Sequence, residues 1–182
     1  MALQVMQDYM AADYDKVTAQ FPVSGAAVPT ELSDTVSWAF VAQGNAFSDQ
    51  AKTKSGAEAD RLFDLAGEKY EAALKIKPDK HEALNNWGNA LLEQAKTKSG
   101  VEADRLFDLA REKCLATDAI VPGKGAYNLA CISALQGQEA ECREWLEKSK
   151  TYGELLSRDH MLKDADLASV RDKDWFQALI GT

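Results

Sequence analysis

The sequence is poor in the residues that most often carry chemistry. It holds two histidines and three cysteines, and the cysteines form neither a C-x-x-C pair nor an even set for disulfides. His160 lies close to Asp159 and Asp164 in the sequence, but no third nitrogen or sulfur ligand stands at a readable spacing. Gly123-Lys124-Gly125 is too short for a phosphate-binding loop. We therefore expect no enzymatic activity, no metal and no cofactor.

Basic clusters and long apolar runs are also lacking. The net charge of -8, without a clustered basic face, argues against nucleic acid or an anionic membrane as the main partner. No apolar run reaches the roughly 18 residues of a membrane span. The start of the chain lacks the basic stretch and apolar block of a signal peptide. Together with the unpaired cysteines, these absences predict a soluble protein of the reducing cytoplasm.

What the sequence does have is an internal duplication. The segment 50–69 reads QAKTKSGAEADRLFDLAGEK, and the segment 94–113, displaced by 44 residues, reads QAKTKSGVEADRLFDLAREK. The two segments differ only at Ala57 against Val101 and at Gly67 against Arg111. Near-identical segments at a fixed spacing indicate a chain built of stacked units rather than one irregular core.

Each unit is predicted to contain two helices. In the second unit, apolar residues at spacings of three and four predict a first helix, with Trp87 and Leu91 buried between units. Ser55 and Ser99, each followed three residues later by a glutamate, match the capping box that begins a helix. The second helices are expected to end before Pro78 and Pro122, because proline cannot continue a helix.

These residues resemble the tetratricopeptide repeat (TPR) family. The resemblance rests on a first-helix set and on a second-helix set from the preceding unit: Leu84, Trp87, Gly88, Ala90 and Leu91, then Ala66, Tyr70, Ala73 and Pro78. A third unit follows from Tyr127, with Ala130 in place of the glycine. The small residue at this place lets two helices approach closely. The resemblance implies an all-α fold, an α-solenoid of three TPR-like helix pairs with N- and C-terminal capping helices.

Units one and two are longer than the family's unit by about ten residues. Since the capping serines follow directly after Ala-Lys-Thr-Lys, we expect both helices of these units to lengthen to about 18 to 22 residues. A solvated loop of about ten residues is the alternative. The expected divisions are an amphipathic helix, a linker, three units and a C-terminal cap: 1–21, 22–30, 31–150 (units 31–80, 81–122 and 123–150) and 151–182.

The two ends of the chain are expected to be helical. Apolar residues at helical spacing predict one amphipathic helix over residues 1–21, with a face made of Leu3, Met6, Met10, Tyr14, Val17 and Phe21. This helix either caps the first unit or lies in the groove of the solenoid and competes with a partner. The apolar residues of 151–182 are expected to cover the last unit, because an open solenoid must shield its terminal face.

The resemblance implies a concave groove lined by the first helix of each unit. It places twelve residues there: Trp38, Val41, Asn45, Asp49, Glu82, Asn85, Asn86, Asn89, Glu93, Lys124, Tyr127 and Cys131. Asparagine suits such a site because one amide both donates to and accepts from a peptide backbone. The family's clamp for a C-terminal carboxylate is expected to be incomplete, because Val41 and Asn128 stand where it needs cations.

The expected function is a non-catalytic protein-protein interaction module that binds a peptide or a partner helix. The acidic groove residues predict a partner that is neutral to basic. One alternative is a dedicated chaperone resembling the class II chaperones of type III secretion. Another is a structural repeat protein that associates with itself as a homo-oligomer.

Overall fold

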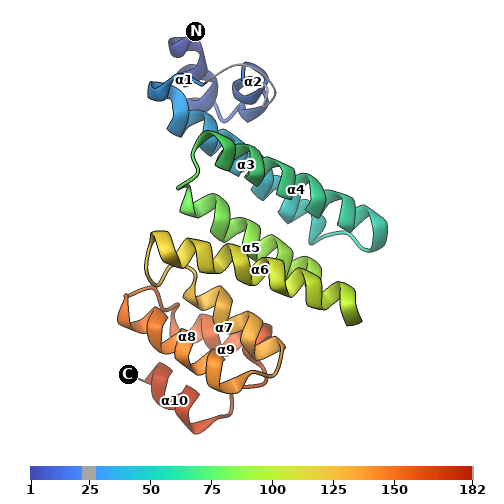
Figure 1. Ribbon diagram of the computed structural model, residues 1–182, viewed down its shortest axis with the longest axis vertical. Helices are drawn as coiled ribbons and strands as arrows, with labels where there is room; N and C mark the ends of the chain where they lie inside the picture. Colours follow the sequence, from blue (N-terminus) through green and yellow to red (C-terminus); the bar gives the residue numbers. More distant parts are fainter. Residues whose placement is uncertain (22–27, 182) are drawn as a thin grey trace.

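The computed structural model describes residues 1–21 and 28–181, and this part of the chain is helical without a strand. Figure 1 shows the helices stacked from one terminus to the other. Three antiparallel pairs form the body: α3 (Ser33–Ala51) with α4 (Gly56–Ile76), α5 (His81–Ala95) with α6 (Gly100–Ile120), and α7 (Ala126–Leu135) with α8 (Glu139–Thr151). The predicted all-α solenoid of three helix pairs is confirmed.

Glycines let the two helices of a pair approach closely. A Cβ atom added at Gly44 of α3 would lie 2.6 Å from the ring of Tyr70, which stands on α4. At the equivalent place in the next pair, a Cβ added at Gly88 would lie 2.6 Å from Sγ of Cys114 on α6. Both contacts are shorter than two carbon-sized atoms allow, so neither glycine can be replaced without movement.

The core has two parts that meet at the second pair. The first part joins α3 and α4 to the N-terminal helices and includes the fully buried Tyr70 and Val36. The second part joins α7 and α8 to the C-terminal segment and includes Leu129, Leu146 and Phe176. Each terminal segment therefore extends the apolar core of the pair beside it, as a solenoid cap must.

The helices of units one and two differ in part from the predicted lengths. Helices α3, α4 and α6 have 19, 21 and 21 residues, whereas α5 has only 15. Ser55 and Ser99 stand at the N-cap positions, but neither side chain makes the capping hydrogen bond. Gly56 and Gly100 follow with φ of 60° and 58°, so the first residue of each helix is left-handed rather than right-handed. The predicted capping boxes are therefore wrong.

A lysine of the repeated segment ties the first pair to the second. Nζ of Lys98, in the turn before α6, lies 2.6 Å from a carboxylate oxygen of Asp60 on α4. The equivalent lysine of the first copy, Lys54, instead pairs with Glu58 one turn away at 2.9 Å. The same side chain therefore joins two units where a preceding copy exists.

The N-terminal segment is two helices rather than the single predicted helix over residues 1–21. Helix α1 (Ala2–Met10) ends where Ala12 takes a φ of 57°, and the N–H of Asp13 donates to the carbonyl of Asp8. Asp13 then caps α2 (Tyr14–Ala19) by accepting from the N–H of Lys16. This left-handed helix end folds the chain back, so it breaks the predicted apolar face.

The fold-back decides which apolar side chains the N-terminal segment buries. Val5, Val17 and Phe21 are buried in the first core, whereas Leu3 and Met10 are 72% and 82% exposed. Helices α1 and α2 both contact α3. The segment is thus a cap on the first pair. Most of the predicted linker, residues 22–30, lies outside the described residues, and it ends in a short 3-10 helix, η1 (Thr30–Leu32).

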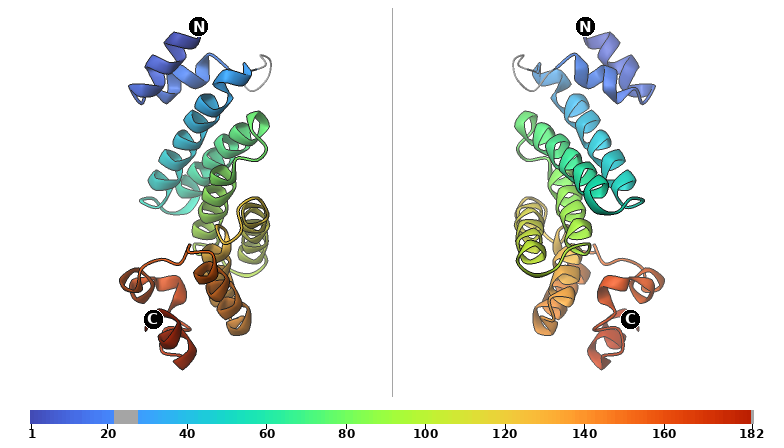
Figure 2. Two further views of the ribbon diagram at one scale, coloured as in Figure 1. Left: turned by 90° about the vertical axis from the view of Figure 1, so that its left-hand side faces the viewer. Right: turned by 90° about the vertical axis from the view of Figure 1, so that its right-hand side faces the viewer.

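The C-terminal segment folds back beside the third pair. It contains α9 (Arg158–Lys163), the 3-10 turn η2 (Ala165–Leu167) and α10 (Asp174–Gly181). Figure 2 shows this segment to one side of α7 and α8. Met161, Leu167 and Phe176 are fully buried against the third pair. The segment covers the last apolar face, and its position brings polar side chains onto the first helices of the units.

Candidate functional site

The first helices α3, α5 and α7 carry a polar surface with two adjoining hollows. The first hollow, of about 250 Å³, lies between α3 and α5 and is lined by Asn45, Ser48, Asp49, Lys52, Tyr70, Asn86 and Asn89. The second, of about 370 Å³, lies between α5, α7 and the C-terminal segment. Asn86 and Asn89 line both hollows. We call the two hollows together the groove.

Asparagine side chains join successive units along the groove. The amide nitrogen of Asn86 donates to Oδ1 of Asn45 at 3.0 Å, and that of Asn128 donates to Oδ1 of Asn85 at 3.1 Å. Oδ1 of Asn45 also accepts from the hydroxyl of Tyr70 at 2.8 Å. These bonds fix how the first helices of successive units lie against each other, because sliding one helix along its neighbour would leave part-buried amides unpaired.

Asn89 differs from the other asparagines of the groove. Within residues 1–21 and 28–181 its side chain makes no hydrogen bond, and it lies where the two hollows meet. It therefore offers both a donor and an acceptor to a ligand. Of the predicted binding row Asn45, Asn85 and Asn89, the side-chain oxygens of the first two already accept hydrogen bonds within the protein.

The C-terminal segment supplies acidic groups to the second hollow. A carboxylate oxygen of Asp164 accepts from the hydroxyl of Tyr127 at 2.7 Å, and Asp166 pairs with Lys96 at 2.9 Å. Lys96 also pairs with Glu93 at 2.7 Å. Burial raises the pKa of the Asp166 carboxyl, although Lys96 opposes this rise. The acidic groups outnumber the basic ones here, so the hollow suits a neutral or cationic group.

Three possible metal ligands meet in the second hollow, but their surroundings do not fit a metal. Ligand atoms of Cys131, Asp164 and Asp166 lie within 4.8 Å of one another. Burial and the two carboxylates raise the pKa of the Cys131 thiol well above its usual value, so the thiol stays protonated. Lys96 and Tyr127 already bind the carboxylates. The cluster is held by the protein's own donors.

Eight of the twelve predicted groove residues line the hollows. These are Asn45, Asp49, Asn85, Asn86, Asn89, Glu93, Tyr127 and Cys131. Cys131 lies at the bottom, with 2% of its surface exposed.

The other four predicted residues lie elsewhere. Val41 is fully buried in the first core, and the ammonium of Lys80 lies 4.0 Å from the ring centre of Trp38. Glu82 lies 3.5 Å from the imidazole of His81, and Lys124 pairs with Glu154 at 2.7 Å. The resemblance placed Trp38 and Val41 in the groove, but both side chains pack in the first core.

Sequence reasoning missed the groove residues that come from the C-terminal segment. Leu156, His160, Asp164, Ala165 and Asp166 line the second hollow, together with Lys96 from the end of α5. The apolar spacing of residues 151–182 predicted a cap but carried no signal for which surface its polar side chains would face.

A comparison with protein families identifies the central part of the chain. Residues 36–142 match the model of the plant specific mitochondrial import receptor subunit TOM20 family. The match covers more than half of the chain. The chain belongs to this family. The matched segment runs from α3 into α8. Both capping segments of this TOM20 family member therefore lie outside the match, and so do Asp164 and Asp166.

The family is one of receptors rather than enzymes, which agrees with the expected absence of catalysis. A protein-binding role is therefore shown, at the level of the family. No curated protein and no solved structure matches the chain. None of the helices in the described part of this TOM20 family member has the length and apolar character needed to cross a membrane.

Proposed function

We propose that this chain is a receptor subunit that holds a segment of a polypeptide to be imported into mitochondria. The observation that carries the proposal is the match of residues 36–142 to an import receptor family, over the helices that form the groove. Such a receptor faces the compartment in which the polypeptide is made, so we place it on the cytoplasmic side. The sequence predicted a cytoplasmic location, and this proposal specifies the cytoplasmic side of mitochondria.

In this proposal the TPR-like units 31–80, 81–122 and 123–150 are the elements of the receptor, and residues 1–21 and 151–182 are its caps. The bound segment lies across α3, α5 and α7. The side-chain amide of Asn89, which has no partner in the described residues, forms hydrogen bonds with the backbone of the bound segment. Asn85 and Asn86 offer the amide atoms that are not already bonded, on either side of Asn89. A partner or chaperone cargo bound elsewhere on the chain is the competing arrangement.

The charge of the groove sets the preferred ligand. Asp49 is paired with Lys52, and Asp166 and Glu93 share Lys96, which leaves Asp164 as an acid held only by neutral or distant donors. A segment with lysine or arginine gains from this excess of acid, whereas an acidic segment is repelled. The attraction is long-range, so association slows as salt is raised.

A titration against defined peptides tests the proposal. The probes are a short fluorescein-labelled peptide with lysines and a matched peptide with glutamates at the same places, followed by fluorescence anisotropy. Asn89→Ala should weaken binding of the lysine peptide by about 1 to 3 kcal/mol, because it leaves polar groups of the peptide unpaired. Asn85→Ala should weaken it less.

The control is His81→Ala, since His81 lies outside both hollows. Equal affinity of the wild type, Asn89→Ala and Asn85→Ala would move the binding site away from the groove. Equal affinity for both peptides would contradict the charge argument alone.

A further inference from the structure

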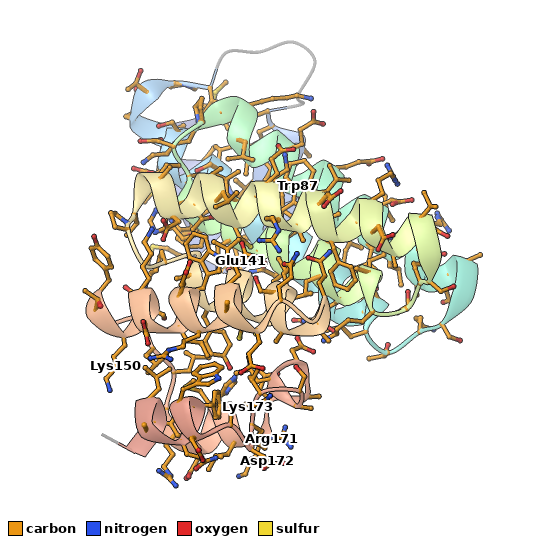
Figure 3. All side chains as sticks on the ribbon, turned by 60° about the horizontal axis from the view of Figure 1, so that its bottom comes forward. Trp87, Glu141, Lys150, Arg171, Asp172 and Lys173 are labelled. Atoms are coloured by element: carbon orange, nitrogen blue, oxygen red, sulfur yellow. The ribbon has the colours of Figure 1, made fainter. Side chains whose placement is uncertain are left out.

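The two ends of the groove differ. No described residue of the N-terminal segment lines the first hollow, whereas the C-terminal segment lines the second hollow beside α7. Figure 3, turned so that the C-terminal end of the stack comes forward, shows the segment that carries Arg171 at this end. We call the lining residues of this segment the end wall: Leu156, His160, Asp164, Ala165 and Asp166.

The end wall is held firmly in place. Met161 and Leu167, which flank its aspartates in the sequence, are fully buried against the third pair. The guanidinium of Arg171 donates to the backbone carbonyl of Asp164 at 2.8 Å, and the N–H of Asp166 donates to the carboxylate of Asp164 at 3.0 Å. Buried side chains and bonded backbone keep a segment from opening easily. A polypeptide that lies along the groove from α3 therefore meets a barrier beside α7.

The charge beside the end wall decides which end of a polypeptide fits there. The carboxylates of Glu93, Asp164 and Asp166 line the second hollow with the single ammonium of Lys96. Burial raises the pKa of the Asp166 carboxyl, Lys96 opposes this rise, and the charges of Asp164 and Glu93 add to it. Lys96 therefore leaves part of the negative charge unbalanced. A terminal carboxylate is repelled here, whereas a terminal ammonium is attracted.

Asp164 is the acid best placed to receive an ammonium. No lysine or arginine pairs with its carboxylate in the part of the chain that the structure describes, and the imidazole of His160 lies 3.9 Å away. The carboxylate accepts from the hydroxyl of Tyr127 at 2.7 Å and from the thiol of Cys131 at 3.9 Å, in addition to the N–H of Asp166. Because a carboxylate has about four acceptor positions, Asp164 has room for one more donor.

From the end wall and the unbalanced carboxylates, we infer that the closed end of the groove binds the free α-ammonium group of the polypeptide, and that acetylation of this amino group prevents the contact. The ammonium lies between Glu93 and Asp164, and the main chain then runs past Asn89 toward α3. This inference rests on the proposed function, and it adds the chemical state of the amino terminus that the groove accepts.

The α-ammonium fits this place better than a lysine side chain does. It is attached directly to the main chain, so a polypeptide that stops at the end wall brings it to the carboxylates. A lysine ammonium stands at the end of a four-carbon stem and leaves the main chain to continue into the barrier. The helices α7, α5 and α3 lie about 10 Å apart in turn, so about six extended residues reach from the wall to α3.

Three short peptides of one sequence, each with fluorescein at the C-terminal residue, test the inference. The first has a free amino terminus, the second an acetylated amino terminus, and the third a free amino terminus with one acetylated lysine near its C-terminal end. The second and third have the same net charge. At about pH 7, where an α-amino group is mostly protonated, the second peptide should bind the full-length protein about tenfold more weakly than the third. Fluorescence anisotropy measures the affinities.

Three variants place the contact within the groove. Asp164→Asn and Glu93→Gln should each reduce the difference between the free and the acetylated peptide. Asp49→Asn removes the same charge in the first hollow, so it should leave this difference as it is in the wild type. Glu93 lies on α5 outside the end wall, so Glu93→Gln keeps the test valid if Asp164→Asn disturbs the wall. Circular dichroism checks the fold of each variant.

The direction of the bound peptide gives an independent measurement. A nitroxide label at the C-terminal residue of the free peptide should broaden the amide signals of α3 in the ¹⁵N-labelled protein more strongly than those of α7. The opposite pattern would reverse the peptide and overturn the inference.

The remaining outcomes separate this inference from the function on which it rests. Equal affinity for the free and the acetylated peptide, with both weakened by Asn89→Ala, would overturn the inference and leave the groove as the binding site. An equal loss of the difference in Asp49→Asn and Asp164→Asn would assign it to the overall charge and also overturn the inference. Absence of binding by all three peptides would contradict the proposed function itself, and this inference with it.

Discussion

The two copies of the repeated segment have almost the same sequence and the same backbone, yet they pack differently. Both begin 21-residue helices after an extended serine and a left-handed glycine. Beyond the copied segment, Tyr70 fills the space over Gly44, whereas Cys114 fills the equivalent space over Gly88. Local sequence thus sets the helix, and the neighbouring unit sets what the helix is packed against.

The largest difference between the copies should come from removing Tyr70. Tyr70 is 1% exposed, packs on Gly44 and donates to Asn45, so Tyr70→Ala should lower the free energy of unfolding by about 3 to 5 kcal/mol. Cys114→Ala removes one buried sulfur and should lower it by about 1 kcal/mol. Urea unfolding followed by circular dichroism measures both. Similar losses for the two variants would mean that the copies pack alike.

A smaller difference should separate the two glycines that face neighbouring side chains. Gly88→Ala places a methyl group against Cys114 and the carbonyl of Ala110, and should destabilise the fold by about 1 to 3 kcal/mol. Gly67→Ala meets only the edge of a half-buried indole, and alanine is favoured over glycine in a helix by about 1 kcal/mol. Gly67→Ala should therefore be neutral or stabilising in the same unfolding measurement.

The hydrogen bonds and ion pair of Arg111 should contribute less to the free energy of unfolding than the packing at Gly88 does. Arg111→Ala removes the bonds to Glu141, Gln136 and Gln138, which are partly exposed, and should lower stability by about 1 kcal/mol. The loss should shrink in high salt, because salt screens the ion pair with Glu141. Arg105→Ala, which removes an arginine without a partner in the described residues, is the matched control. A loss that does not change with salt would assign the effect to packing.

The smallest effect should appear as a pH dependence. Burial raises the pKa of the thiols of Cys114 and Cys142 to about 12. The folded state therefore keeps protons that the unfolded state loses above about pH 9, so stability is present below pH 9 and falls as pH rises toward 12. Under reducing conditions, Cys114→Ala should lose less stability between pH 8 and 10 than the wild type, by about 1 kcal/mol. Equal losses would contradict a buried, protonated thiol.

Much of the fold could be predicted because the signals that carry it are local. The duplication, the helical spacing around Leu84 and the breaks at Pro78 and Pro122 depend on residues a few positions apart. The break at Ala12 could not be predicted, because alanine favours a helix. The left-handed turn there is stabilised by the burial of Val5 and Val17, which the local sequence does not show. The capping boxes failed for a related reason, because Gly56 and Gly100 take a turn that a sequence pattern does not show.

The groove residues on the first helices of the units could be predicted, whereas those supplied by the C-terminal segment could not. Asn86 and Asn89 follow from the resemblance of the first helices to a known repeat. Asp164 and Asp166 reach the groove only because residues 151–181 fold back beside α7. Trp87 was expected to be buried because of its helical spacing, but it is half-exposed beside Gly67, the position at which the second copy has Arg111.

The ion pair between Lys98 and Asp60 has a consequence for how such a chain can grow. Both partners lie inside the repeated segment, so each copy carries one half of the contact to the copy before it and one half of the contact to the copy after it. Asp104, the counterpart of Asp60, makes no ion pair in the described residues. An additional in-frame copy inserted after the second would present its own lysine to Asp104. Lengthening by whole copies therefore creates a matched junction at once, without a compensating mutation.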